Sequence, residues 1–251
     1  AEATGYFPAV FIWTTVDREV LLDLFEELTG ARWSFNHFLP GGVHKDFPEG
    51  FSDKIIEAVH YLRNRFKDYW TAMVENPMFE MRCDGVAILE PKDALRLGAT
   101  GPVIRGSGIP IDMRKEEPYA AYADLDWEII TEDACDVMAR TKVRFHEIGQ
   151  ALNMMEQIAK EIPEGEIKTR FSPFARAPEG EHISRVENGR GEMATHMWTN
   201  GTTNPYRVKI LPPSLRNMYV FERLAELSHI TIADIPVVIN SIDPWYLDSD
   251  R

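Results

Sequence analysis

The feature that most constrains the fold is one long amphipathic stretch, residues 132–161. Its apolar side chains recur every three or four residues, with a threonine as the one polar member, and the stripe consists of Val137, Thr141, Phe145, Ile148, Leu152, Met155, Ala159 and Ile162. This is the period of one face of an α-helix. A helix of this length is about 45 Å long. Other elements must cover its apolar stripe, so we expect the chain to fold around it.

Several other segments provide elements that can pack on this helix. Further helices are predicted at residues 16–29, 53–75, 91–97 and 215–229, and residues 230–242 fit a short helix or an extended segment. Thr15 and Ser52 are the expected N-caps of the first two helices. Residues 183–210 predict a β-meander with Asn-Gly turns. The sequence therefore predicts an α+β fold that is mainly α, with one small antiparallel sheet.

The charge and the cysteine count exclude several functions. The 251 residues include 27 basic and 40 acidic side chains, which give a net charge of −13 with histidine neutral. This charge argues against a nucleic-acid-binding face and against direct docking on anionic lipid, because both need basic side chains. The two cysteines, Cys83 and Cys135, cannot supply the four thiolates of an iron–sulfur cluster or of a Cys₄ zinc site.

The N-terminal stretch bears on membrane insertion and on completeness. The longest uncharged segment, residues 3–16, is shorter than the roughly 20 residues that span a bilayer, and no basic segment precedes it. We therefore expect neither a membrane span nor a signal peptide, and a cytoplasmic location. Because the chain begins with Ala and enters an apolar stretch at once, we also expect it to be a processed protein, a split protein or a part of a longer one.

Local motifs that often reveal an enzyme class are not decisive here. The glycine-rich segments 98–101 and 105–108 lack the Gly-Lys-Ser/Thr of a P-loop and the strand–turn–helix context of a dinucleotide site. Tight turns of the backbone through a crowded core are expected instead. The seven histidines form no His-x-x-x-His pair, so no metal site is predicted.

Two groups of charged residues leave alternatives open. His44 lies in a loop bounded by proline and glycine, and it is either an exposed loop residue or a titrating group beside a redox centre. Asp136, Arg140 and Arg144 share one face of the long helix. They are either a solvated charge pair or buried charges that are paired with one another.

Eight collinear segments, spread over the whole chain, are similar to one protein family. They are Gly30-Ala31-Arg32; residues 40–46, Pro-Gly-Gly-Val-His-Lys-Asp; residues 97–108, Leu-Gly-x-x-Gly-Pro-Val-Ile-Arg-Gly-Ser-Gly; residues 112–119, Asp-x-Arg-Lys-x-x-Pro-Tyr; Arg140-x-x-x-Arg144; Glu187-x-x-x-Gly191-Glu192; residues 204–210, Asn-Pro-Tyr-Arg-Val-Lys-Ile; and Ala233-Asp234-Ile235 leading to Asp243 and Asp250-Arg251. The chain resembles the quinone-site subunit of respiratory complex I, the 49-kilodalton or D subunit, and its relatives in archaeal deazaflavin dehydrogenases and membrane-bound hydrogenases.

The resemblance also implies an architecture, because this family descends from the large subunit of nickel–iron hydrogenases. It implies that residues 1–251 are the C-terminal two thirds of a hydrogenase large-subunit-like domain. A helical core would cover about residues 15–162, followed by the β-meander at 183–210 and a C-terminal segment, 214–251, that returns to the core.

The C-terminal frame indicates that an ancestral metal site has been lost. The hydrogenase branch ends in Asp-Pro-Cys-x-x-Cys-x-x-His or -Arg, whose thiolates bind nickel and iron, whereas here Trp245 and Asp248 occupy the two cysteine positions. An indole cannot ligate a metal, and one carboxylate does not replace two soft thiolates. We therefore expect no metal or cofactor bound by this chain. The retained Asn-Ser-Ile-Asp-Pro at 240–244 favours the archaeal branches, which include membrane-bound sulfane reductases.

The resemblance assigns roles to individual residues. His44 matches the histidine beside the terminal iron–sulfur cluster of the partner subunit, and Asp243 and Arg251 match positions that line the old metal cavity, now the acceptor pocket. Shaping and charge-pairing groups near this cavity are expected to be Arg32, Arg105, Asp112, Arg114 and Asp248. The N-terminal third of the family carries the His-Pro-x-x-His-Gly motif and the tyrosine that bond the quinone headgroup. This chain lacks both, so those ligands cannot be assigned.

Three functions follow from the resemblance. The first is the catalytic-core subunit of a complex-I-like oxidoreductase of the NADH or deazaflavin type, peripheral on the cytoplasmic side of the membrane. It would pass electrons from the iron–sulfur cluster of a small subunit to a quinone-type acceptor. Its further partners would be other peripheral-arm subunits and membrane subunits that pump ions. The second keeps the family but takes a sulfur compound or protons as acceptor, as in a sulfane reductase or hydrogenase-like complex, and the third is a non-catalytic scaffold.

Overall fold

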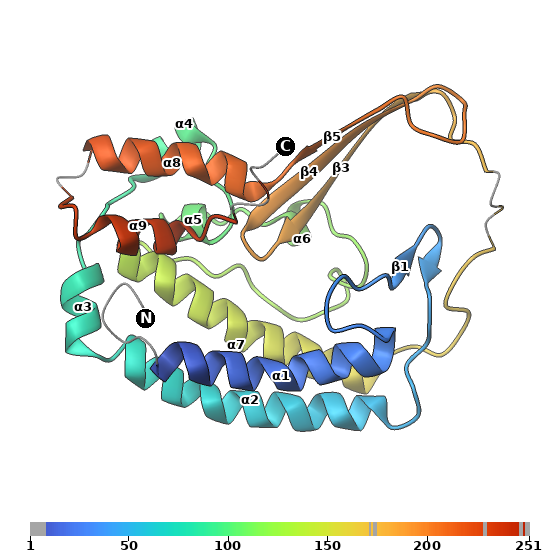
Figure 1. Ribbon diagram of the computed structural model, residues 1–251, viewed down its shortest axis with the longest axis horizontal. Coiled ribbons are helices and arrows are strands. Elements are labelled where there is room, and N and C mark those ends of the chain that lie inside the picture. Colours follow the sequence, from blue (N-terminus) through green and yellow to red (C-terminus); the bar gives the residue numbers. More distant parts are fainter. Residues whose placement is uncertain (1–8, 171, 173–174, 228–229, 246–247, 249–251) are drawn as a thin grey trace.

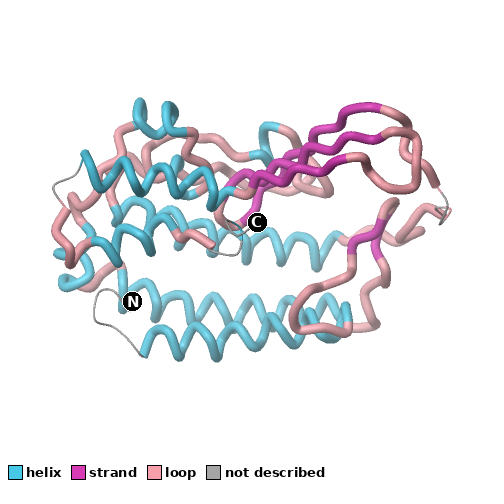
Figure 2. The backbone as a smooth tube through the Cα atoms, turned by 45° about the horizontal axis from the view of Figure 1, so that its top comes forward, coloured by secondary structure: helices cyan, strands magenta, loops and turns pink. Residues whose placement is uncertain are grey.

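The computed structural model describes residues 9–170, 172, 175–227, 230–245 and 248. Helices dominate this part of the chain, and two small antiparallel sheets accompany them (Figures 1 and 2). The predicted fold class, α+β and mainly α, is confirmed. Among the described helices, none combines the length and the apolar character that crossing a bilayer would require.

One layer consists of three long helices that lie side by side. They are α1 (Ala9–Thr29), α2 (Phe51–Met73) and α7 (Val137–Glu161). Helix α2 packs against both of the others and runs opposite to them (Figure 1). The core of this layer consists of Phe51, Ile55, Val59, Leu152 and Ala159, with Leu24 and Leu28 packed against it. The amphipathic stripe of the long predicted helix is thus covered mainly by α2.

The starts of the first two helices differ from the predictions. Helix α1 begins at Ala9, so Thr15 lies inside it, where its hydroxyl donates to the Phe11 carbonyl at 2.8 Å. The N-cap predicted at Thr15 is therefore wrong. Helix α2 begins after Gly50, whose φ of 73° is left-handed, and not at Ser52.

The longest helix is five residues shorter at its N-terminus than predicted. It begins at Val137 because the Asp136 carboxylate accepts a hydrogen bond from the Ala139 N–H at 2.7 Å, which makes Asp136 the N-cap. The preceding residues have no helical conformation. The cap fixes where the charged face of α7 begins.

A second layer packs on the N-terminal half of α7. It contains α3 (Pro77–Cys83), α4 (Pro91–Leu97), α5 (Pro102–Arg105), α8 (Pro213–Leu227) and α9 (Ile235–Ile242). Helix α4 has the predicted bounds, whereas α3 and α5 were not predicted. Each of these three short helices starts with proline at its first position, where the missing N–H is not needed. The largest hydrophobic core of the described chain lies here, around Leu89, Val103, Val220, Leu224 and Val238.

The predicted meander forms a three-stranded antiparallel sheet. Its strands are β3 (Gly180–Asn188), β4 (Gly191–Thr199) and β5 (Arg207–Leu211), in the order β3-β4-β5. Asn188 pairs with Gly191 across a tight turn. A smaller hairpin, β1 (Phe38–Leu39) and β2 (Gly42–Val43), forms in the segment that leads to α2 and directly precedes His44. One end of the larger sheet, with the β3–β4 turn and the end of β5, lies against the helices, and the other end extends away from them (Figures 1 and 2).

Two glycines hold that turn against the helical layers. Gly101 (φ +68°) and Gly191 (φ +129°) face one another so closely that a Cβ on Gly191 would lie 2.7 Å from the Gly101 backbone nitrogen. Both positions therefore require glycine, because the backbone is left-handed there and no room is left for a Cβ. This contact places the β3–β4 turn beside the start of α5 and near α7 and α9, where the candidate site lies.

Candidate functional site

The centre of the candidate site is a buried arginine surrounded by three carboxylates. Arg105, the last residue of α5, has a side chain that is only 2% exposed. Its Nη1 lies 2.9 Å from Glu187 Oε1 and 3.1 Å from Asp112 Oδ2, and its Nε lies 2.7 Å from Glu147 Oε1. Glu187 comes from β3 and Glu147 from α7. Asp112 lies in the loop before the short helix α6 (Met113–Glu116). We call these four residues the Arg105 cluster.

Asp112 links this cluster to a second arginine. It is the N-cap of α6, where it accepts a hydrogen bond from the Arg114 N–H at 3.0 Å. The Arg114 side chain grips the same carboxylate in a bidentate manner, with Nε to Oδ1 at 2.9 Å and Nη2 to Oδ2 at 2.6 Å. Burial opposes ionisation of Asp112, but the hydrogen bonds from Arg114 and the charge of Arg105 outweigh it and lower the pKa of Asp112.

Glu187 lies in the same cluster, yet its pKa moves the other way. Its carboxylate is 4% exposed, and it accepts from Arg105 and from the Met113 N–H at 3.2 Å. Burial raises the pKa of Glu187, although the charge of Arg105 opposes this effect. Two carboxylates on one arginine therefore have opposite shifts, which is a common arrangement where protons are exchanged.

A polar pocket of 390 Å³ opens beside the cluster. It lies between α7, the β3–β4 turn and the end of α9, and it is lined by Arg105, Arg114, Tyr122, Arg144, Glu147, Ile148, Ala151, Glu187, Asn188, Gly189 and Asp243. Asp243 follows α9 with a left-handed φ of 57°. Its side chain pairs with the guanidinium of Arg190 in the β3–β4 turn, whose Nε lies 3.2 Å from Asp243 Oδ2.

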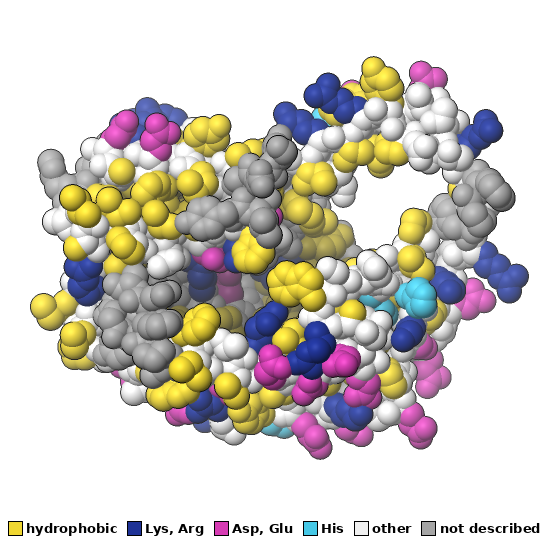
Figure 3. All heavy atoms as spheres, viewed as in Figure 1, with side chains coloured by type: hydrophobic (Ala, Val, Ile, Leu, Met, Phe, Trp, Pro, Cys, Tyr) yellow, Lys and Arg dark blue, Asp and Glu magenta, His cyan; other side chains and the backbone are white. Residues whose placement is uncertain are grey.

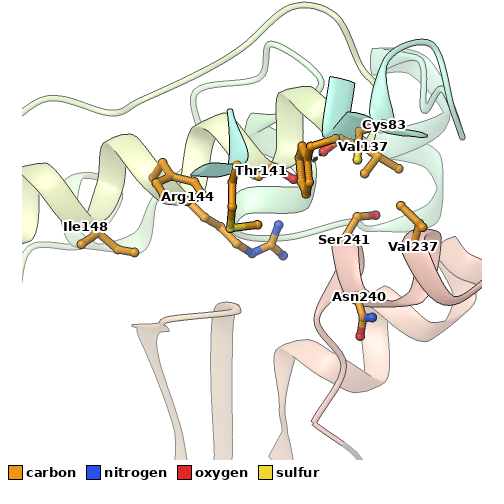
Figure 4. Close-up of a pocket in the computed structure, with 11 residues that line it drawn as sticks. Cys83, Val137, Thr141, Arg144, Ile148, Val237, Asn240 and Ser241 are labelled. Carbon is orange, nitrogen blue, oxygen red and sulfur yellow. Dashed lines mark hydrogen bonds between the residues drawn. The ribbon is translucent and has the colours of Figure 1, made fainter. Parts of the chain in front are cut away.

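A second, more apolar pocket of 280 Å³ adjoins the first. Its lining comes from α2, α3, α7 and α9 and consists of Met73, Phe79, Cys83, Val137, Thr141, Arg144, Phe145, Ile148, Val237, Asn240 and Ser241 (Figure 4). Arg144 and Ile148 line both pockets. We call the two together the two-part pocket. It offers an apolar compartment for a ring or chain and a charged compartment for polar groups.

A third pocket contains Trp245 and Asp248, the two residues that the resemblance matches to the metal-binding cysteines of the hydrogenase branch. It is lined by Arg18, Trp33, Asn188, Arg190, Trp245 and Asp248. The Arg190 guanidinium lies over the Trp245 ring, with its Cζ 5.2 Å from the ring centroid. The Asp248 carboxylate accepts a hydrogen bond from the Ser214 hydroxyl at 2.9 Å. These two side chains offer no thiolate, so the positions do not fit a nickel–iron centre.

The remaining cysteines do not replace those thiolates. Cys83 and Cys135 are both free, and burial raises the pKa of Cys83 to about 12. In the described part of the chain, no group of three or more histidine, cysteine, aspartate or glutamate side chains is arranged to hold a metal ion.

The structure brings together five of the eight predicted site residues. Arg105, Arg114 and Asp243 line the polar pocket, Asp112 lies directly behind it, and Asp248 lines the neighbouring third pocket. The interlayer space that holds these pockets is hollowed in the space-filling view (Figure 3).

Three predicted residues lie elsewhere or outside the description. His44 is exposed beside the β1–β2 hairpin, where its backbone N–H donates to the His37 carbonyl at 2.7 Å. Arg32 pairs on the surface with carboxylates of α1 and does not line the pockets above. Arg251 lies outside the described residues.

Sequence reasoning did not select Glu187, Glu147 and Arg144 as site residues. Glu187 stands in one of the eight family segments, directly before the Asn-Gly turn, and a carboxylate at that place is the signal by which the sequence could have revealed it. Arg144 is predicted to share a helix face with Arg140, and the two stand together in another of the family segments. The structure shows Arg140 fully buried, where it donates to the carbonyls of Cys135 and Ala87, and Arg144 partly buried at the pockets.

Comparison with known proteins identifies the class to which this fold belongs, the oxidoreductase subunits of respiratory complexes. The chain belongs to the family described as the 49 Kd subunit of the respiratory-chain NADH dehydrogenase, whose model matches residues 5–175 and 169–251. The predicted resemblance is confirmed.

Two relatives and one solved structure illustrate the family. The D subunit of the F(420)H(2) dehydrogenase of Methanosarcina mazei is 36% identical over 98% of this chain and 67% of its own length. The corresponding subunit of the NADH-quinone oxidoreductase of Desulforamulus reducens is 35% identical over 93% of this chain and 63% of its own length. A chain of the membrane-bound sulfane sulfur reductase, an archaeal respiratory membrane complex, matches with a TM-score of 0.90 and 34% identity, over 95% of this chain and 66% of that one. The chain thus spans about two thirds of the length of these relatives.

Proposed function

We propose that the chain is the catalytic-core subunit of a complex-I-like, membrane-associated oxidoreductase that reduces a quinone-type acceptor. The two-part pocket carries this proposal. A quinone has an apolar ring with polar oxygens, and the pocket offers an apolar compartment beside a charged one, joined at Arg144 and Ile148. Relatives named for quinone oxidoreduction support the same acceptor class.

The chemistry consumes electrons and protons in equal number. A quinone takes up two electrons and two protons and becomes a quinol. We propose that the electrons come from an iron–sulfur cluster held by a neighbouring small subunit, and that this chain binds no cofactor of its own. Asp243 has a side chain that is 42% exposed at the rim of the polar pocket. It is therefore placed to exchange protons with water and to relay them towards the acceptor.

The surface around the β1–β2 hairpin is the proposed contact with that small subunit. Phe38 is 83% exposed and Leu39 is also exposed, beside the exposed His44. Apolar side chains next to one another at a surface are typical of a protein contact. In this position His44 would lie near the partner's cluster and take up a proton when the cluster is reduced. Arg251 is proposed to complete the acceptor pocket.

Ion translocation belongs to other subunits in this proposal. The energy released by acceptor reduction would drive pumping in membrane subunits, while this chain is bound peripherally on the cytoplasmic side. The NADH or deazaflavin donor would be oxidised elsewhere in the peripheral arm.

The intact membrane complex that contains the chain provides the test. Reduced methyl viologen supplies electrons, and the reduction of decylubiquinone is followed by absorbance. We expect turnover in the wild type, and a loss of about 100-fold in kcat for Asp243→Asn if it relays protons. Asp124→Asn, which changes an exposed carboxylate outside the pockets, is the matched control and should turn over like the wild type. No quinone reduction by the wild-type complex would falsify the proposal.

A sulfur compound is the second candidate acceptor, because a chain of the sulfane sulfur reductase complex has the same fold with a TM-score of 0.90. The same complex is assayed with polysulfide, and the released sulfide is measured. Polysulfide turnover without quinone turnover would select this acceptor. If His44→Ala and Asp243→Asn both leave turnover with either acceptor unchanged, the chain is a scaffold.

A further inference from the structure

One arginine of the two-part pocket differs from all the others near it. Among the residues that the structure describes, the buried Nε and Nη2 atoms of Arg144 have no hydrogen-bond partner, while Nη1 donates to the Arg140 carbonyl at 3.1 Å. By contrast, Arg105, Arg114 and Arg190 each face a carboxylate. Arg144 is therefore the one of these four arginines whose donors and charge are left over.

The unpaired atoms form the edge of the guanidinium that binds anions side-on. Arg114 uses the same pair, Nε and Nη2, to hold both oxygens of Asp112. A planar fork of this kind matches two oxygens of one group, or one oxygen that accepts from both N–H groups. Arg144 thus presents a preformed oxyanion-binding edge.

The carboxylates nearest to Arg144 are already engaged. Glu147 accepts from Arg105 at 2.7 Å, and Asp243 pairs with Arg190. A buried cation without a counter-charge is costly, and burial lowers the pKa of Arg144 although Asp243 and Glu147 act in the opposite direction. A negatively charged group that enters the pocket would remove this cost.

The position of the side chain shows where such a group would be. Arg144 extends from α7 into the space towards α9, which carries Asn240 and Ser241 (Figure 4). It lines the apolar and the polar compartment alike. A ligand that fills both compartments must pass this guanidinium.

We propose that the Nε–Nη2 edge of Arg144 binds the end of the electron acceptor that carries, or gains on reduction, negative charge. The proposal rests on the proposed function and deepens it, because it names the group in this chain that holds the acceptor. A quinone oxygen gains negative charge on reduction, and a polysulfide carries it from the start. Both present the chemistry that this edge recognises.

The test compares Arg144→Met, Arg144→Lys and the wild type in the intact complex, with decylubiquinone and polysulfide as separate acceptors. For the acceptor that the wild type reduces, we expect KM to rise about 10- to 100-fold in Arg144→Met, because this substitution removes the charged hydrogen bonds to the acceptor. Lysine keeps the charge but loses the fork, so Arg144→Lys should lie between the two. The matched control is Arg96→Met, which replaces an arginine that is 60% exposed and pairs with Asp93 on its own helix.

A stability readout separates acceptor binding from a structural role. Methionine removes a buried unpaired charge, so Arg144→Met should melt no earlier than the wild type when no acceptor is present. A KM within twofold of the wild type in an active Arg144→Met complex would overturn the inference and leave the proposed function intact. Loss of the small subunit from that complex would also overturn it, because Arg144 would then pair with a partner carboxylate. An inactive wild-type complex would instead overturn the proposed function itself.

Discussion

Two regions of the molecule place one arginine against three carboxylates, yet their surroundings differ completely. Arg105 meets Asp112, Glu147 and Glu187 in the interior, with a side chain that is 2% exposed. Arg32 meets Glu19, Asp23 and Glu26 on the surface of α1, with a side chain that is 39% exposed. The composition of the two clusters is nearly the same, so the difference between them isolates the effect of burial.

Burial changes both the energy and the use of such a cluster. On the surface, water screens the charges, and the ordering of long side chains offsets much of the attraction. In the interior the charges depend on one another, because Arg105, Asp112 and Glu187 are almost completely shielded from water. The partners also differ in origin. Three of the surface charges share one helix, whereas the Arg105 cluster joins α5, α7 and β3 with the loop before α6. The buried cluster therefore fixes the walls of the polar pocket.

The largest effect is expected from Arg105→Met. The substitution leaves three carboxylates without their shared cation, two of them almost fully buried, and should lower the free energy of unfolding by about 3–5 kcal/mol. Urea unfolding of the purified chain at pH 7 measures this. Arg96→Met is the matched control and should unfold like the wild type. A loss below 1 kcal/mol, by the magnitude expected of surface pairs, would show that burial does not distinguish the two clusters.

The next effect is expected from Asp112→Asn, and it depends on pH. The pKa of Asp112 is lowered from its usual 3.8, because Arg114 and Arg105 outweigh burial. Its contribution to stability is therefore complete above pH 3.8 and is lost as the pH falls through the folded pKa. We expect the free energy of unfolding of the variant at pH 7 to be about 2 kcal/mol below that of the wild type, because the charged hydrogen bonds to Asp112 are lost. This difference in the free energy of unfolding should become smaller in acid. A difference that stays constant from pH 7 to pH 2 would contradict a lowered pKa of Asp112.

A smaller effect of the opposite sign is expected from Glu187→Gln. Burial raises the pKa of Glu187 from its usual 4.5. The wild type must then lose stability as the pH rises from 4.5 through the folded pKa, since the folded form binds the proton more tightly. Glutamine does not titrate, and its oxygen still accepts from Arg105. Relative to the wild type, the variant should gain stability with rising pH, as measured by urea unfolding between pH 4 and pH 8. If the variant instead loses stability relative to the wild type as the pH rises, the pKa of Glu187 is not raised.

The same comparison shows what the sequence could predict. The long helix and the meander are predictable because their periods are local. The N-cap expected at Thr15 is wrong because a threonine hydroxyl can also bond to a carbonyl inside a helix, as Thr15 does. Arg105, Asp112 and Arg114 were selected through the family resemblance. Glu187 lies 82 residues from Arg105 in the chain. No local pattern reports such a pairing, and none reports that two donors of Arg144 find no partner in the part of the chain that the structure describes.

The smallest effect is expected from Arg32→Met, although Arg32 has as many acidic partners as Arg105. Its hydrogen bonds to Asp23 and Glu26 raise the pKa of Arg32, yet arginine is charged at all ordinary pH values, so that shift adds nothing near neutrality. Screening by salt then decides the outcome. We expect no measurable change of the urea midpoint at about 0.15 M salt, and a small decrease at about 0.01 M. The carboxylates left behind are on one solvated face of α1, where water replaces the arginine. A decrease that persists at high salt would mean that the charges of this cluster are coupled as strongly as those of the interior, and burial would then not be what separates the two arginines.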